Sequence, residues 1–131
     1  MKVIVAGAGA FGKKHLDGIQ NMEGVEVIGL VGRRLGQTQM VANQYGIAEA
    51  YTDLTDALAL PGLDAAILCT PTQMHAEQAI KCMQAGVHVQ IEIPLADNWN
   101  DALGVLQMQA ETGLVCMVGH TRRFNPSHQY L

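Results

Sequence analysis

The sequence predicts one doubly wound α/β domain, in which a six-stranded parallel sheet carries helices on both faces. Six short apolar runs alternate with helical patterns along the 131 residues. The first run leads directly into a glycine-rich turn, Gly7 to Gly12. The composition is 49% hydrophobic and only 15% charged, as expected where a sheet is buried on both sides. Six strands joined by crossover helices make a complete doubly wound sheet, for which the expected strand order is 3-2-1-4-5-6.

Each element follows from a local pattern of apolar and turn residues. Strands are expected at residues 2–6, 25–31, 48–51, 64–69, 87–91 and 114–118, and helices at about 10–21, 35–44, 53–59 and 72–85. Thr72 is expected to cap the fourth helix. A fifth helix begins at Asp97 or Asn98 and ends at Gly113. Its spacing predicts a buried stripe made by Trp99, Ala102, Leu103, Leu106 and Ala110.

The end of the chain suggests a second unit. Asn125 and Pro126 form a good helix start, yet only five residues follow Pro126. We therefore expect residues 1–120 to form a nucleotide-binding domain. Residues 121–131 would begin the connection to a C-terminal substrate domain that is not in this chain.

The turn after the first strand predicts a dinucleotide site. Its sequence is Gly7-Ala8-Gly9-Ala10-Phe11-Gly12. The first glycine permits a tight turn, the second lets backbone amides approach a pyrophosphate, and the third lets the helix pack against the sheet. The helix N-terminus offers free N–H groups to the phosphates. We expect Gly7, Gly9, Ala10, Phe11 and Gly12 to contact the cofactor.

The residues after the second strand predict which dinucleotide is bound. NAD-binding proteins usually place an acid there for the ribose hydroxyls, whereas this chain has Gly32-Arg33-Arg34. Two guanidinium groups suit the 2′-phosphate of NADP. The alternative is a pair of solvated arginines at a helix start, which the helix dipole disfavours unless an anion is near. Lys13 and Lys14 are weaker candidates for the same phosphates.

Other polar residues lie where strands end, at the edge that binds ligands in parallel sheets. Thr70, Thr72, His75 and Glu92 are expected to hold the ribose and nicotinamide end of the cofactor. His75 could instead bond to water or backbone. Arg122 and Arg123 follow the sixth strand and are candidates for substrate binding, and a salt bridge is the equal alternative.

Charge and cysteine content exclude several classes of protein. The net charge of −4 and the pI of about 5.6 argue against nucleic-acid binding. No apolar run is long enough to cross a membrane. Cys69, Cys82 and Cys116 lie far apart, without metal-ligand spacing, and fit thiols of a cytoplasmic protein. No metal site is expected.

Four segments together resemble the glucose–fructose oxidoreductase, inositol dehydrogenase and MocA family of NAD(P)-dependent oxidoreductases. They are Gly7 to His15, Cys69 to His75, Glu92 to Leu95, and Arg122 to Pro126. The resemblance implies a Rossmann domain followed by a substrate domain that supplies the catalytic groups and a homo-oligomer interface. Catalytic residues within this chain are therefore unknown.

The family pattern Glu-Lys-Pro becomes Glu92-Ile93-Pro94 here. Isoleucine cannot polarise a substrate oxygen, which argues against ordinary sugar oxidation. Residues 92–97 and 119–126 are most similar to members that oxidise the cyclic hemiacetal of a carboxylated semialdehyde with NADP in aromatic catabolism. A sugar or inositol dehydrogenase, and a non-enzymatic regulator that binds NADP, are the alternatives.

Overall fold

The computed structural model of the protein describes residues 1–130 and contains one six-stranded sheet, in the order β3-β2-β1-β4-β5-β6. All neighbouring strands are parallel, which confirms the predicted fold class and strand order. The order reverses between β1 and β4, where such sheets form a ligand-binding crevice. The strands are β1 (Lys2–Ala6), β2 (Glu26–Val31), β3 (Glu49–Tyr51), β4 (Ala65–Leu68), β5 (His88–Glu92) and β6 (Cys116–Gly119).

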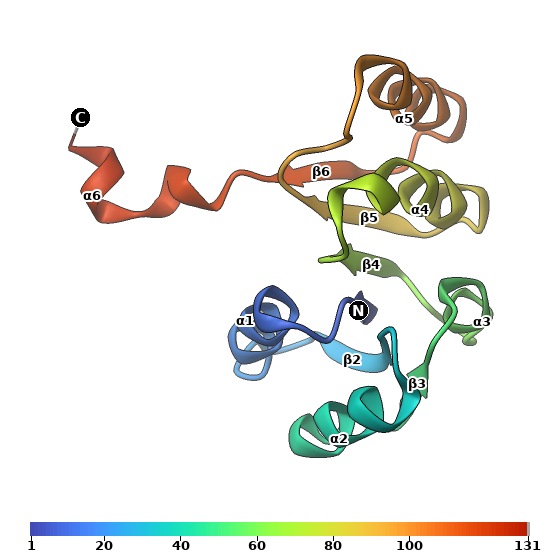
Figure 1. Cartoon of the computed structure of the whole chain (residues 1–131), viewed down its shortest axis with the longest axis vertical. Coiled ribbons are helices and arrows are strands. Elements are labelled where there is room, and N and C mark those ends of the chain that lie inside the picture. Colours follow the sequence, from blue (N-terminus) through green and yellow to red (C-terminus); the bar gives the residue numbers. More distant parts are fainter. Residues whose placement is uncertain (131) are drawn as a thin grey trace.

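Helices lie on both sides of this sheet (Figure 1). The helices α1 (Ala10–Ile19) and α2 (Leu35–Tyr45) connect the first three strands. The helices α3 (Leu54–Leu58) and α4 (Thr72–Gln84) cover the opposite face, and α5 (Trp99–Thr112) packs beside α4. The bounds of these elements differ from the expected ones by at most two residues.

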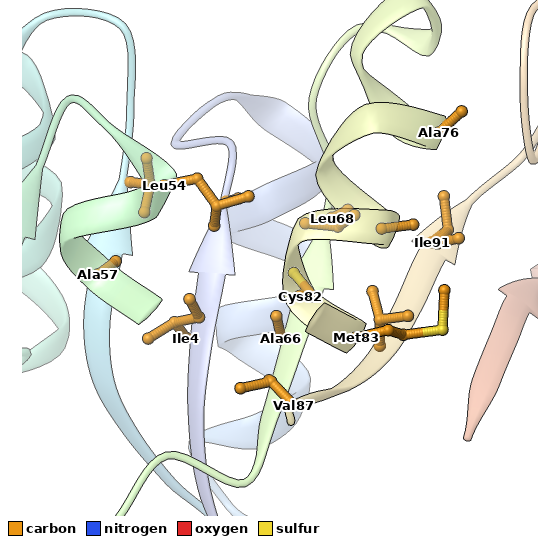
Figure 2. Packing of buried hydrophobic residues seen from close by; sticks show 14 of the residues in the cluster. Ile4, Leu54, Ala57, Ala66, Leu68, Ala76, Cys82, Met83, Val87 and Ile91 are labelled. Carbon is orange, nitrogen blue, oxygen red and sulfur yellow. The ribbon is translucent and has the colours of Figure 1, made fainter. Parts of the chain in front are cut away.

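Adjacent residues of β1 belong to two different cores. Ile4 and Ala6 join the cluster that packs against α3 and α4, with Met83 among its largest buried side chains (Figure 2). Val5 points the other way and joins Leu16 in the cluster against α1 and α2. A strand that is buried on both faces needs a continuous apolar run, which explains the composition of this segment.

The predicted start of α4 is wrong by one position, whereas the ends of α5 are as expected. Pro71 occupies the N-cap of α4, so Thr72 is already helical and its side chain does not cap the helix. In α5, Asn98 is the cap, and its side-chain oxygen accepts a hydrogen bond from the Asp101 N–H at 3.0 Å. Gly113 ends α5 with a φ of +67°.

The predicted buried stripe of α5 is also wrong. Trp99 is 73% exposed, Leu103 and Leu106 are exposed as well, and Ala110 lies on the same open side. Of the predicted stripe only Ala102 is half-buried. The side of α5 that meets the core instead carries Val105, which is 1% exposed, and Met108. Because α5 packs beside α4 at the end of the sheet, only a narrow part of its surface is covered.

The last residues extend away from the sheet (Figure 1). A 3₁₀ turn, η1 (Thr121–Phe124), is followed by α6 (Pro126–Gln129). The predicted helix start is confirmed, since the Asn125 side chain accepts a hydrogen bond from the Ser127 N–H at 3.0 Å. The division of the chain at residue 120 stays a prediction, and residue 131 lies outside the described residues.

Within residues 1–130, no helix combines the length and the apolar character needed to cross a bilayer.

Candidate functional site

A cleft of about 650 Å³ lies at the carboxyl ends of β1, β2 and β4. The glycine turn forms one wall, the residues after β2 form the rim, and the start of α4 forms the opposite wall. The predicted residues that line it are Gly7, Gly9, Arg33, Arg34 and Thr70. The structure therefore brings the glycine turn and the arginine pair to the same cavity. A smaller cavity of about 270 Å³ lies between α1, β2 and the end of α2.

The glycine turn is held by contacts that permit no side chain at two of its positions. Gly7 has a φ of +113°, and a Cβ there would lie 2.5 Å from the Cys69 carbonyl oxygen. A Cβ on Gly12 would lie 1.7 Å from the Gly7 carbonyl oxygen. The first and third glycines thus allow β1, its turn and α1 to pack together. Ala10 and Phe11 form the exposed first residues of α1, with the Lys14 ammonium 5.3 Å from the Phe11 ring centroid.

Gly9 differs from its neighbours, because a Cβ there would meet nothing within 4 Å. Its φ of −83° and ψ of −164° suit any residue. Space left open over a helix N-terminus is what a pyrophosphate needs to reach backbone N–H groups. The turn therefore fits a dinucleotide at this position.

We expect Gly9→Ala to separate binding from stability. The added methyl group occupies the space for the pyrophosphate, so the affinity for NADP should fall about tenfold or more. The free energy of unfolding should fall by no more than about 1 kcal/mol, because Gly9 is the N-cap of α1 and alanine is the poorer cap, while no other contact is lost. Titration calorimetry and chemical denaturation measure the two effects; equal affinity in both proteins would contradict the placement of the pyrophosphate.

The rim after β2 carries two exposed guanidinium groups and no acid at residues 32–34. Arg34 is the N-cap of α2, and its carbonyl oxygen accepts hydrogen bonds from the N–H of Thr38 at 2.9 Å and from its hydroxyl at 2.8 Å. Asp53 also lines the cleft, and its carboxylate caps α3 by accepting a hydrogen bond from the Thr55 N–H at 2.7 Å. That bond lowers the pKa of Asp53.

Thr70 and His75 hold the end of β4 in place. The Thr70 hydroxyl donates to the Gln78 side-chain oxygen at 2.5 Å, and both residues line the cleft. His75 is 1% exposed; its Nε2 lies 2.7 Å from the Thr70 carbonyl oxygen and its Nδ1 lies 2.8 Å from that of Pro94. This geometry favours the alternative in which His75 bonds to backbone. Contact between His75 or Thr72 and a cofactor stays a prediction.

Glu92 has a partner that its sequence position did not suggest. Its Oε1 accepts a hydrogen bond from His15 Nε2 at 2.6 Å, with side-chain exposures of 11% and 18%. The pair joins the end of β5 to α1. Ribose contact by Glu92 stays a prediction, as does substrate contact by Arg122 and Arg123, which are exposed on η1. In the part of the chain that the structure describes, the only other ion pair is Glu77–Lys81.

Two residues of the cleft could not be singled out beforehand. Thr38 and Gln78 are buried at 1% and 8% exposure. Thr38 lies about one turn from the start of α2, and Gln78 lies nearly two turns from the start of α4. The sequence signal for such residues is a polar side chain at a helical position that otherwise faces the sheet and would be apolar. No three His, Cys, Asp or Glu side chains gather as a metal site within residues 1–130.

The thiol of Cys69 also lines the cleft, and burial, followed by the charge of Glu92, raises its pKa to about 12. At pH 8 only about one thiol in ten thousand would be ionised. We therefore expect Cys69 to resist iodoacetamide in the folded protein and to react after unfolding, as followed by mass spectrometry. Rapid labelling of folded protein at pH 8 would contradict this. Because the folded pKa is the higher one, this thiol lowers stability only as the pH rises above about 9.

Comparison with known proteins agrees with this geometry. The profile described as "Oxidoreductase family, NAD-binding Rossmann fold" matches residues 1–120. The chain belongs to this GFO/IDH/MocA family. The predicted family is thereby confirmed. The chain spans about 40% of the length of the curated relatives that it matches.

One relative of this chain is a 4-carboxy-2-hydroxymuconate-6-semialdehyde dehydrogenase from Sphingobium. The two are 63% identical over all 131 residues of this chain, which correspond to 42% of the length of the relative. A scyllo-inositol 2-dehydrogenase (NAD(+)) from Bacillus subtilis is 30% identical over 98% of this chain and 38% of its own. The predicted likeness to dehydrogenases of carboxylated semialdehydes is thus confirmed at the level of sequence.

Solved structures of related dehydrogenases share the fold. Myo-inositol 2-dehydrogenase from Lactobacillus plantarum matches with a TM-score of 0.92 at 25% identity, over 99% of this chain and 39% of that one. The WlbA dehydrogenase from Bordetella pertussis, solved in complex with NADH and UDP-GlcNAcA, matches with a TM-score of 0.91 at 29% identity, over 98% and 39%.

Proposed function

We propose that this protein takes part in the NADP-dependent oxidation of a carboxylated hemiacetal or semialdehyde. The substrate proposed is the cyclic hemiacetal of 4-carboxy-2-hydroxymuconate-6-semialdehyde, and the product is 2-pyrone-4,6-dicarboxylate, in the 4,5-cleavage pathway of protocatechuate. The 63% identity to a dehydrogenase of that name carries the substrate. In a full-length protein of this kind, the present chain would supply the part that binds the cofactor.

The cleft supports a dinucleotide as the group bound. The open space over Gly9 suits its pyrophosphate, and the cleft continues from there to Arg33 and Arg34. A hydrogen bond between charged groups is worth about 1.5–3 kcal/mol, so the arginine pair would favour NADP over NAD at least about tenfold. The names of one relative and one solved structure give NAD(+) and NADH instead, so a preference for NAD is the competing possibility.

The nicotinamide would accept hydride from the hemiacetal carbon while a base removes the hydroxyl proton. A hemiacetal already carries its hydroxyl on the reacting carbon, so the reaction does not need a cation at Ile93, which is 40% exposed beside Glu92. Arg122 and Arg123 would offer guanidinium groups to the substrate's carboxylates.

The test is turnover by the full-length protein, followed at 340 nm with freshly prepared semialdehyde. We expect kcat/KM with NADP to exceed that with NAD about tenfold or more. Turnover of myo-inositol or a hexose in its place would favour a sugar or inositol dehydrogenase. Binding of NADP without turnover of either substrate would favour the regulator. Equal use of the two cofactors would overturn the NADP part alone.

A further inference from the structure

The end of β2 contains a contact that involves neither arginine. We propose that Thr38 contributes to the cofactor preference, because its buried side chain leaves no room at position 32 for the acid that would bind the ribose of NAD. This inference rests on the proposed function, in which the site takes NADP. It assigns the selectivity to a steric cause as well as to the charge of Arg33 and Arg34.

Gly32 occupies the last position before the arginine pair, at the end of the strand where an acid binds the ribose hydroxyls in NAD-dependent proteins. Its backbone N–H donates to the Tyr51 carbonyl oxygen at 2.9 Å, and it lines the cleft. Gly32 is not among the glycines with positive φ. Backbone conformation therefore does not demand glycine at this position.

Space does demand it. A Cβ on residue 32 would lie 2.2 Å from the Thr38 hydroxyl oxygen, 3.2 Å from the Thr38 Cβ and 3.1 Å from the Ala8 Cβ. The first of these distances is far inside van der Waals contact, whereas the other two need a shift of only a few tenths of an ångström. The hydroxyl of Thr38 is thus the group that excludes a side chain.

Thr38 cannot easily move out of the way. It is 1% exposed on the inner side of α2, and its hydroxyl donates to the Arg34 carbonyl oxygen at 2.8 Å. Rotation about its Cα–Cβ bond would break that hydrogen bond. One of the two other staggered positions would also put the branched methyl group into the same space, because threonine carries two heavy atoms on Cβ. Thr38 therefore leaves no room for a side chain at position 32. A carboxylate at that position would repel the 2′-phosphate of NADP.

The test compares four variants of the full-length protein: Gly32→Asp, Thr38→Ala, Gly32→Asp with Thr38→Ala, and Gly32→Asp with Thr38→Val. Valine keeps two γ heavy atoms and alanine keeps none, so the last variant is the matched control. Thermal unfolding without ligand gives the stability of each protein. Titration calorimetry gives the affinity for NAD and for NADP.

Gly32→Asp alone should lower the unfolding temperature and gain no affinity for NAD. Adding Thr38→Ala should restore most of the loss and raise the affinity for NAD about tenfold or more above that of Gly32→Asp, whereas Thr38→Val should do neither. The inference is overturned if Gly32→Asp is as stable as the unmodified protein, or if valine rescues as well as alanine. Equal binding of NAD and NADP by the unmodified protein would refute the NADP proposal, while rescue of stability by alanine alone would still establish the contact.

Discussion

Gly12→Ala is expected to lower the free energy of unfolding by about 3 kcal/mol or more and to abolish dinucleotide binding. The added Cβ would lie 1.7 Å from the Gly7 carbonyl oxygen. That oxygen belongs to backbone, so α1 must move away from β1 rather than a side chain turning aside. Chemical denaturation and calorimetric titration with NADP measure the two losses.

Gly18→Ala is the matched control in the same helix. Gly18 is exposed, and a Cβ there would meet nothing within 4 Å. Alanine favours the helix, so stability should rise by about 0.5–1 kcal/mol with binding unchanged. If both variants lost stability to the same degree, the close contact between Gly12 and Gly7 would not be the cause.

The double variant Arg33→Ala with Arg34→Ala is expected to bind NADP about a hundredfold more weakly, while NAD binding changes by less than about threefold. Both guanidinium groups lie on the rim of the cleft, and the 2′-phosphate is the only group that distinguishes the two cofactors. Calorimetric titration with each cofactor gives the ratio directly. The loss of NADP affinity should also become smaller at high salt, because the rim is exposed.

Arg122→Ala with Arg123→Ala removes the same charge from η1, outside the cleft. We expect its affinity for NADP to match that of the unmodified protein. A similar loss in this control would point to net charge rather than to a local contact. An equal loss of NAD and NADP affinity in the Arg33 and Arg34 variant would place those side chains away from the 2′-phosphate.

Local sequence was sufficient for the parts of the fold that depend on neighbours in the chain. The strand that leads into Gly7 to Gly12, and the Gly113 that ends α5, each act within a few residues. Their steric requirements can therefore be read directly. The edge of the sheet that binds ligands could be predicted as well, because the carboxyl ends of parallel strands all lie at one edge.

Contacts between distant segments could not be read in this way. His15 and Glu92 are 77 positions apart, and nothing near either residue indicates the other. The surface of α5 that packs inward depends on where α4 lies, so an apolar stripe at helical spacing did not identify it. The sequence places His75 at the carboxyl edge of the sheet, but its carbonyl partners become neighbours only through tertiary structure.

The alternation along β1 means that two independent helical layers share one strand as a common wall. A smaller residue at Ile4 would loosen the layer behind α3 and α4, and one at Val5 would loosen the layer behind α1 and α2. Either substitution would also disturb the position of the glycine turn, since β1 leads directly into it. Nucleotide affinity and the rigidity of either layer are therefore tied together through five residues of backbone.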